Sequence, residues 1–200
     1  GIMTWQETRV EGKQGIELKT GSMRIGVVTE CGPRIAFFGK PDGENLLFWD
    51  AKGIGREDWK LMGGHRIWPT RPGADESEDA YRPDNEPCEV EIDGSAATVT
   101  SPPDPILNIR RGMRMEATAE GRVTVDGFIT NAGDMLYSCG VWGLTCTQPA
   151  PGRTYGIPLG DGSDWDCFRM VFFRAWAGHT GRVDDDQVRC TDDILLLVPQ

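Results

Sequence analysis

A short segment around one histidine combines residue types that can do chemistry. Residues 63–73 read GGHRIWPTRPG and include His65, Arg66 and Trp68. An imidazole with an ordinary pKa of about 6.5 gains or loses a proton near neutral pH, which makes His65 a candidate general acid. His65 can also hold a ligand by a hydrogen bond, or donate to a backbone carbonyl and fix the local chain. The sequence leaves these three roles open.

Arginine and aromatic side chains close to His65 in the sequence can hold a polar ligand. Arg66 and Arg71 offer planar two-point hydrogen bonding to hydroxyls or a carboxylate. The acidic residues that follow at positions 75–79 can pair with these arginines instead. Trp68 and Tyr81 present flat faces against which a sugar ring can stack, each with a polar tip. The alternative is that both aromatics anchor the chain on a sheet.

Two polar residues stand between prolines shortly after this segment. Asp84 and Asn85 lie in YRPDNEP, where Pro83 and Pro87 restrict the backbone. A carboxylate held in this way can orient the imidazole of His65 or accept a sugar hydroxyl. The competing interpretation is an Asx turn, in which the side chains bond only to nearby backbone.

Other chemistries lack their motifs. The sequence has no G-x-S-x-G, no P-loop, no H-x-H and no H-E-x-x-H, so serine-hydrolase, nucleotide and zinc-hydrolase functions are not expected. The acidic runs ADESED and RVDDD lack the ligand spacing of a calcium loop. His179 lies in a glycine-flanked turn and is expected to be solvated. The six cysteines are scattered without a C-x-x-C pair and are expected to be free thiols. We therefore expect neither a metal nor a cofactor.

Strand-like runs that would position these residues recur along the chain, separated by Gly, Pro, Asn and Asp. In residues 122–130, Val123 and Val125 alternate with Thr124 and Asp126, and Gly127 is expected to mark a bulge. No window shows a sustained 3.6-residue apolar period. The pattern predicts an all-β sandwich or barrel with little helix. The runs are GIELKT, MRIGVV, RIAFFG, NLLFW, CEVEID, AATVTS, GMRMEAT, RVTVDGFIT, YSCGVWGLTCT, RMVFFRAW and ILLLVP.

Two segments differ from this pattern. Residues 52–87 are dense in Gly, Pro and charge, and we predict an ordered functional loop there because their aromatic residues argue against disorder. The final run DDILLLVPQ is apolar on both faces, which is typical of a strand inside a sheet. A partner subunit, or further chain beyond Gln200, would cover such a strand if it lay at an edge.

Length and charge limit the class of protein. The 200 residues suit one domain over 1–200, and a net charge of −10 disfavours nucleic acid and anionic membranes as partners. No run approaches the roughly 20 apolar residues of a membrane span, and the first residues lack the apolar core of a secretory signal. We expect a cytoplasmic protein.

Several stretches together resemble the galactose-mutarotase-like (aldose 1-epimerase) superfamily, in particular an uncharacterised bacterial branch. They are LKTGSMRIGVVTECGPRIAFFGKPDGENLLFWD, GGHRIWPTRP, YRPDNEP, VDGFITNAGD and VWGLTCTQPAPGRTYGIPL. The resemblance implies an antiparallel β-supersandwich with a sugar site in the concave face of one sheet. The chain lacks the Asn-His-Pro-type segment of the true enzymes and stops before the position of their late catalytic Glu.

Three functions are consistent with these observations. The first is a carbohydrate-binding or carbohydrate-active protein that, if catalytic, epimerises an anomeric carbon with His65 as acid and an unidentified base. The second is a non-catalytic glycan-binding module in which Arg66, Trp68, Tyr81, Asp84 and Asn85 hold the sugar. The third is a structural domain that forms a homodimer through its carboxy-terminal strand.

Overall fold

The computed structural model describes residues 3–54, 61–70, 82–148, 150–159, 186–191 and 193–198. Within these ranges the secondary structure consists of β-strands without a helix, and every strand pair is antiparallel, which confirms the predicted all-β class. The chain forms two compact units, Gly1–Gln148 and Pro149–Gln200, and each is described by itself.

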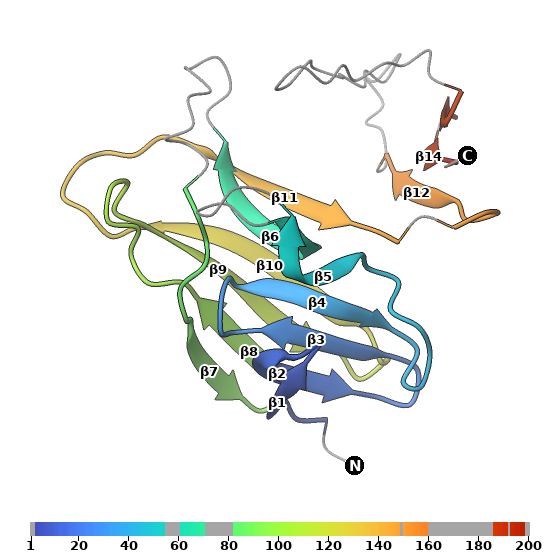
Figure 1. The fold of residues 1–200 in the computed structure, drawn as a ribbon, viewed down its shortest axis with the longest axis horizontal. Helices are drawn as coiled ribbons and strands as arrows, with labels where there is room; N and C mark the ends of the chain where they lie inside the picture. The colour runs from blue at the N-terminus through green and yellow to red at the C-terminus, as the bar shows by residue number, and fades with distance from the viewer. Residues whose placement is uncertain are drawn as a thin grey trace. The chain divides into compact units, whose positions relative to one another are not determined.

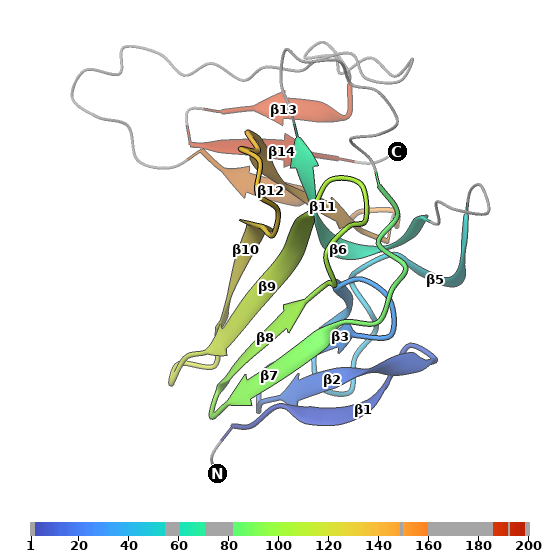
Figure 2. The same ribbon diagram turned by 90° about the vertical axis from the view of Figure 1, so that its left-hand side faces the viewer.

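The first unit contains two sheets, which Figures 1 and 2 show as separate layers. The larger sheet has the order β1-β2-β3-β4-β6-β11, and β5 pairs with β6 outside this path. The smaller sheet has the order β10-β9-β8-β7. The strands of the larger sheet are β1 (Gln6–Val10), β2 (Lys13–Lys19), β3 (Arg24–Val28), β4 (Arg34–Gly39), β5 (Trp49–Ile54), β6 (Leu61–Thr70) and β11 (Gly140–Cys146). Those of the smaller sheet are β7 (Glu89–Asp93), β8 (Ala96–Thr100), β9 (Ile109–Ala117) and β10 (Val123–Asn131).

The main core lies between the two sheets, so this unit is a β-sandwich. The register of β8 and β9 places Val99 opposite Met113 and Ala97 opposite Met115, and all four side chains are buried. Full burial of one aliphatic or methionine side chain stabilises a fold by about 1.5–3 kcal/mol. The buried members of this core are Trp5, Ile16, Leu18, Met23, Ile25, Val27, Ile35, Leu47, Ile67, Ala97, Val99, Met113, Met115 and Ala117.

The prediction of a loop over residues 52–87 is wrong for β6, which spans Leu61–Thr70 and lies between β4 and β11. Both faces of β6 are largely buried, so the apolar alternation of a half-buried strand is absent. Its two glycines permit close approach of neighbouring backbone rather than a turn. A Cβ would lie 2.2 Å from the Phe48 carbonyl oxygen at Gly63 and 2.1 Å from the Ile35 carbonyl oxygen at Gly64.

The predicted bulge at Gly127 is also wrong. The register of β10 on β9 runs without a shift through Asp126, Gly127 and Phe128. A Cβ on Gly127 would lie 2.4 Å from Cδ1 of Ile67. The glycine therefore makes room for a core side chain of β6, which lies in the opposite sheet.

The second unit contains one sheet of three short strands, β12 (Tyr155–Pro158), β13 (Val188–Cys190) and β14 (Ile194–Leu197), in the order β12-β14-β13. The final strand β14 thus lies inside a sheet, as its apolar sequence predicts. Both of its edges are paired within the chain, so neither a partner subunit nor further chain is needed to cover it. The predicted strand at residues 169–176 lies outside the described residues.

Two further findings concern the chain as far as it is described. Among the cysteines of the described residues, Cys31, Cys88, Cys146 and Cys190 are free thiols, as predicted for them. No helix in these ranges is long and apolar enough to cross a membrane.

Candidate functional site

Strand β6 divides the predicted site residues between its two faces. Successive side chains of a strand point to opposite faces, so His65 and Ile67 share one face and Arg66 and Trp68 share the other. The contacts agree with this division, because Ile67 packs against Gly127 of the opposite sheet while Arg66 lies over the Trp68 ring. The sequence places these residues side by side, but the sheet separates them into two groups.

His65 is half-buried and bonded to the neighbouring strand β11. Its Nδ1 atom lies 2.8 Å from Oγ1 of Thr145, the residue directly opposite in the register. Cε1 of the ring lies 3.3 Å from the position of a Cβ on Gly143, so the imidazole extends along the bare backbone of that glycine. Burial lowers the pKa of His65 below 6.5, and the ring is neutral at pH 7.

Arg66 and Trp68 form a buried stack on the other face. The guanidinium carbon of Arg66 lies 4.0 Å from the centroid of the Trp68 ring, a cation–π contact. The Trp68 ring meets Trp142 of β11 edge to face, with 6.2 Å between centroids. Trp68 is only 1% exposed, so its ring has no open face on which a sugar could stack. The contacts match the interpretation of Trp68 as an anchor.

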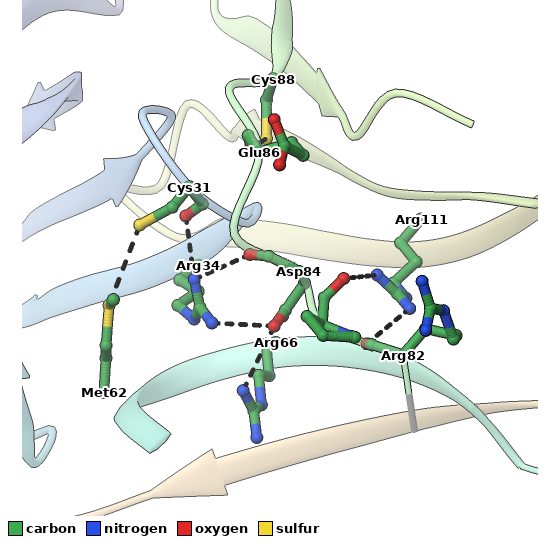
Figure 3. Close-up of polar contacts among 10 residues, drawn as sticks. Cys31, Arg34, Met62, Arg66, Arg82, Asp84, Glu86, Cys88 and Arg111 are labelled. Atoms are coloured by element: carbon green, nitrogen blue, oxygen red, sulfur yellow. Dashed lines mark hydrogen bonds and ion pairs between the residues drawn. The ribbon is translucent and has the colours of Figure 1, made fainter. Parts of the chain in front are cut away.

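Asp84 joins two arginines from different strands (Figure 3). Its Oδ1 atom lies 2.8 Å from Nη2 of Arg34 on β4 and 3.5 Å from Nη1 of Arg66 on β6. Nη1 of Arg34 also donates to the backbone carbonyls of Asp84, at 3.0 Å, and of Cys31, at 3.2 Å. All three charged side chains are almost fully buried. This cluster fastens the connection between β6 and β7 to the larger sheet.

A third buried arginine holds the same connection from the smaller sheet. Arg111 on β9 donates through Nη2 to the carbonyl of Arg82, at 2.9 Å, and through Nη1 to that of Pro83, at 3.4 Å. Burial lowers the pKa of Arg111, and the negative charge of Asp84 opposes that shift. Burial also lowers the pKa of Arg66, and the negative charge of Asp84 again opposes the shift. Arg34, Arg66 and Arg111 therefore converge with Asp84 where the chain passes from one sheet to the other.

The structure brings together part of the predicted site. Arg66, Trp68 and Asp84 are in mutual contact or share a partner, and Asn85 follows Asp84 in a half-buried position. No ion pair joins His65 to a carboxylate of the described residues. Tyr81, Arg71 and His179 lie outside the described residues.

Sequence reasoning missed three participating residues. Arg34 opens the apolar run RIAFFG, and Arg111 interrupts an otherwise buried strand, so a charged residue at a core position was the available signal. Thr145 gave no signal, because its proximity to His65 depends on the register of β11 on β6. No cluster of three or more His, Cys, Asp or Glu that could hold a metal ion occurs in the described ranges.

Comparisons of the chain with protein-family models, with curated proteins and with solved structures gave no match. The class of protein is thus defined by its architecture, an antiparallel β-sandwich with a half-buried neutral histidine and a separate buried arginine–aspartate cluster.

Proposed function

We propose that this protein is a carbohydrate-binding β-sandwich module that holds a neutral sugar at His65 and Thr145. The observation that carries the proposal is the hydrogen bond of 2.8 Å between these side chains on adjacent strands, beside an exposed glycine. The choice of a sugar as ligand rests on the resemblance of the sequence to galactose-mutarotase-like proteins. The choice of site rests on accessibility, because Arg66, Trp68 and Asp84 are buried whereas His65 is partly open.

The chemistry of the pair suits a polyhydroxylated ligand. A neutral imidazole has one N–H donor and one nitrogen acceptor, and a threonine hydroxyl can donate and accept. Thr145 engages Nδ1, so Nε2 is left for a ligand, as a donor or as an acceptor according to the ring tautomer; no described residue bonds to Nε2. Gly143 adds no side chain next to the ring, so a sugar hydroxyl can approach along the strand.

Binding is favoured over epimerisation at the anomeric carbon. Epimerisation needs one group to deliver a proton to the ring oxygen and a second group to remove one from the anomeric hydroxyl. In the described part of the chain, His65 has a hydroxyl as its neighbour and no carboxylate paired with it. Asp84, which the sequence suggested as a helper, is engaged by Arg34 and Arg66.

The test combines calorimetry and polarimetry on the same samples. A panel of neutral monosaccharides and short oligosaccharides is titrated into the wild type, His65→Gln and Thr145→Val, with Thr124→Val on exposed β10 as the matched control. A net hydrogen bond is worth about 0.5–1.5 kcal/mol, so each site variant should weaken binding by roughly 2- to 10-fold while the control binds normally.

Two results would contradict the proposal. If no sugar of the panel binds the wild type, or if the two site variants bind as well as the control, the His65 site is not a sugar site. Polarimetry of fresh α-glucose and α-galactose distinguishes the enzyme from the module. Acceleration by the wild type that is lost in His65→Gln would identify an epimerase instead.

A further inference from the structure

Strand β1 ends the larger sheet on one side, and no strand of the described residues lies beyond it (Figure 2). It pairs with β2 alone, and its first four residues, Gln6, Glu7, Thr8 and Arg9, are exposed in succession. An open strand edge is a template for pairing with another chain. The edge of β1 therefore offers a place at which a further strand can pair.

The bonding of β2 shows which backbone groups of β1 face this open edge. Gln14 lies opposite Arg9, and both of its backbone groups point away from β1. Its N–H donates to Oε2 of Glu30 at 2.9 Å, and its C=O accepts from the Thr29 N–H at 3.0 Å. Opposite residues of an antiparallel ladder either bond to each other or both face away. Arg9 therefore directs its N–H and C=O outward, and so does Glu7, two positions earlier.

The side chains of Glu7 and Arg9 carry opposite charges on one face of β1, because residues two apart on a strand share a face. Neither forms an ion pair with another residue in the described ranges, and the Arg9 guanidinium donates to the Gly12 carbonyl. Charged residues on an edge strand usually prevent pairing. Charges of opposite sign favour it in a register that places them opposite each other.

We propose that β1 pairs antiparallel with β1 of a second copy of this chain, with Thr8 at the two-fold axis. In this register Glu7 lies opposite Arg9 of the second copy, and Arg9 lies opposite its Glu7. The outward-facing N–H and C=O groups of both residues are then hydrogen-bonded, and two pairs of opposite charge form. A two-fold axis at Glu7 or at Arg9 would place like charges opposite each other, so the charges select Thr8. Pairing of a strand with its own copy satisfies the symmetry of a closed dimer.

The edge strand β7 of the smaller sheet lacks this self-complementarity. It carries Glu89, Glu91 and Asp93 at alternate positions and has no positive charge. Every antiparallel pairing of β7 with its own copy about a two-fold axis would place carboxylates opposite carboxylates. In a chain of net charge −10 this contact is repulsive. Of these two edges, only that of β1 suits a second copy.

This dimer differs from the one expected from the sequence. A dimer through the carboxy-terminal strand would need an open edge on β14, but β12 and β13 occupy both of its edges. The pairing of β1 is also independent of sugar binding, since His65 lies on β6. The dimer and the sugar site can therefore fail or succeed separately.

The experiment measures mass against concentration by sedimentation equilibrium. The wild type should approach twice the monomer mass of 22.1 kDa as concentration rises. Glu7→Arg and Arg9→Glu each make both charge pairs repulsive, and each should weaken the dimer at least about tenfold. Glu91→Arg, which makes the same change of charge at an exposed position of β7, should leave the dimer unchanged. Circular dichroism verifies that each variant folds.

Two rescues test the register. The double variant Glu7→Arg/Arg9→Glu restores opposite charges across the axis and should form a dimer again. A mixture of the two single variants should form a heterodimer, because one chain then presents two positive charges and the other presents two negative charges. A dimer that persists in both single variants, or that neither rescue restores, overturns the proposal.

Hydrogen exchange in the wild type gives a readout that needs no variant. The amides of Glu7 and Arg9 should become more protected as protein concentration rises, because they face the second copy. The amide of Thr8 faces β2 and should be equally protected at all concentrations. A wild type that remains a monomer, or Glu7 and Arg9 amides whose exchange does not depend on concentration, overturns the proposal.

Discussion

Arg34 and Asp84 are 50 positions apart in the sequence and form a buried ion pair with 2.8 Å between Nη2 and Oδ1. Arg34 belongs to β4, whereas Asp84 lies in the connection that leads from β6 to β7. Because Asp84 also contacts Arg66, one carboxylate links two strands of the larger sheet to the start of the smaller sheet. The stability of the sandwich should therefore depend on this carboxylate.

The first prediction concerns the loss of that charge. Asp84→Ala leaves buried guanidinium groups of Arg34 and Arg66 without their shared carboxylate, and should lower the free energy of unfolding by about 3–5 kcal/mol. Urea denaturation followed by tryptophan fluorescence measures the change. Asp42→Ala is the matched control, because its ion pair with Lys19 is exposed and contributes little. An unfolding midpoint for Asp84→Ala equal to that of the control would refute the structural role.

The second prediction concerns the pH dependence of stability. Burial lowers the pKa of His65 in the folded state below its ordinary value of 6.5. Below pH 6.5 the unfolded chain therefore binds more protons at this residue than the folded chain does, and stability falls until the pH reaches the folded pKa. Well above pH 6.5 both states are neutral here and the contribution is constant.

The measurement compares wild type and His65→Gln at a series of pH values. The difference in their unfolding free energies should change between pH 6.5 and the folded pKa, and be flat above this window. NMR titration of the His65 ring protons should give the same folded pKa. A midpoint above 6.5 would contradict the burial of the imidazole.

The third prediction concerns thiol reactivity, which requires the thiolate form. Burial raises the pKa of Cys88 to about 12, and it also raises the pKa of Cys31 and Cys146. Cys190 is exposed. Alkylation with iodoacetamide at pH 8, followed by mass spectrometry of the peptides, should therefore modify Cys190 well before Cys31 and Cys88. Labelling of Cys88 at the rate of Cys190 would contradict this order, and labelling in denaturant provides the control for intrinsic reactivity.

The sequence predicts strands where one face of a strand is buried and the other is exposed. In β10, Val123 and Val125 are more buried than Thr124 and Asp126, and the alternation is visible in the letters. Strand β1 has four exposed residues in succession and shows no apolar signal. Strand β6 is buried on both faces and contains two glycines, so its composition is typical of a loop. The class of fold could thus be predicted, but not these two strands.

The candidate site was less predictable than the fold, because its contacts depend on register and on long-range pairing. The proximity of His65, Arg66 and Trp68 in the sequence suggested a single cluster, yet alternation along a strand sends His65 to the opposite face. The partners of these residues, Arg34 and Thr145, come from strands β4 and β11. Local sequence carries no information on which residues of those strands lie opposite β6.

The fourth prediction tests why β6 needs glycine. Gly64 has φ +70°, and a Cβ there would lie 2.1 Å from the Ile35 carbonyl oxygen, which belongs to the backbone of β4 and cannot move aside without breaking the pairing. Gly94 has a similar φ of +61° but no atom within 4 Å of its Cβ position. Gly94→Ala should therefore cost only the strain of the left-handed backbone, about 1–2 kcal/mol.

Gly64→Ala should cost at least about 2 kcal/mol more than Gly94→Ala, because overlap with a strand backbone adds to the same conformational strain. Thermal and urea unfolding of both variants measure this difference. If the two variants have equal stability, close approach of β4 to β6 does not explain the glycine. Position 64 would then require glycine only because of its φ of +70°. The close contact between β4 and β6 would not be the reason.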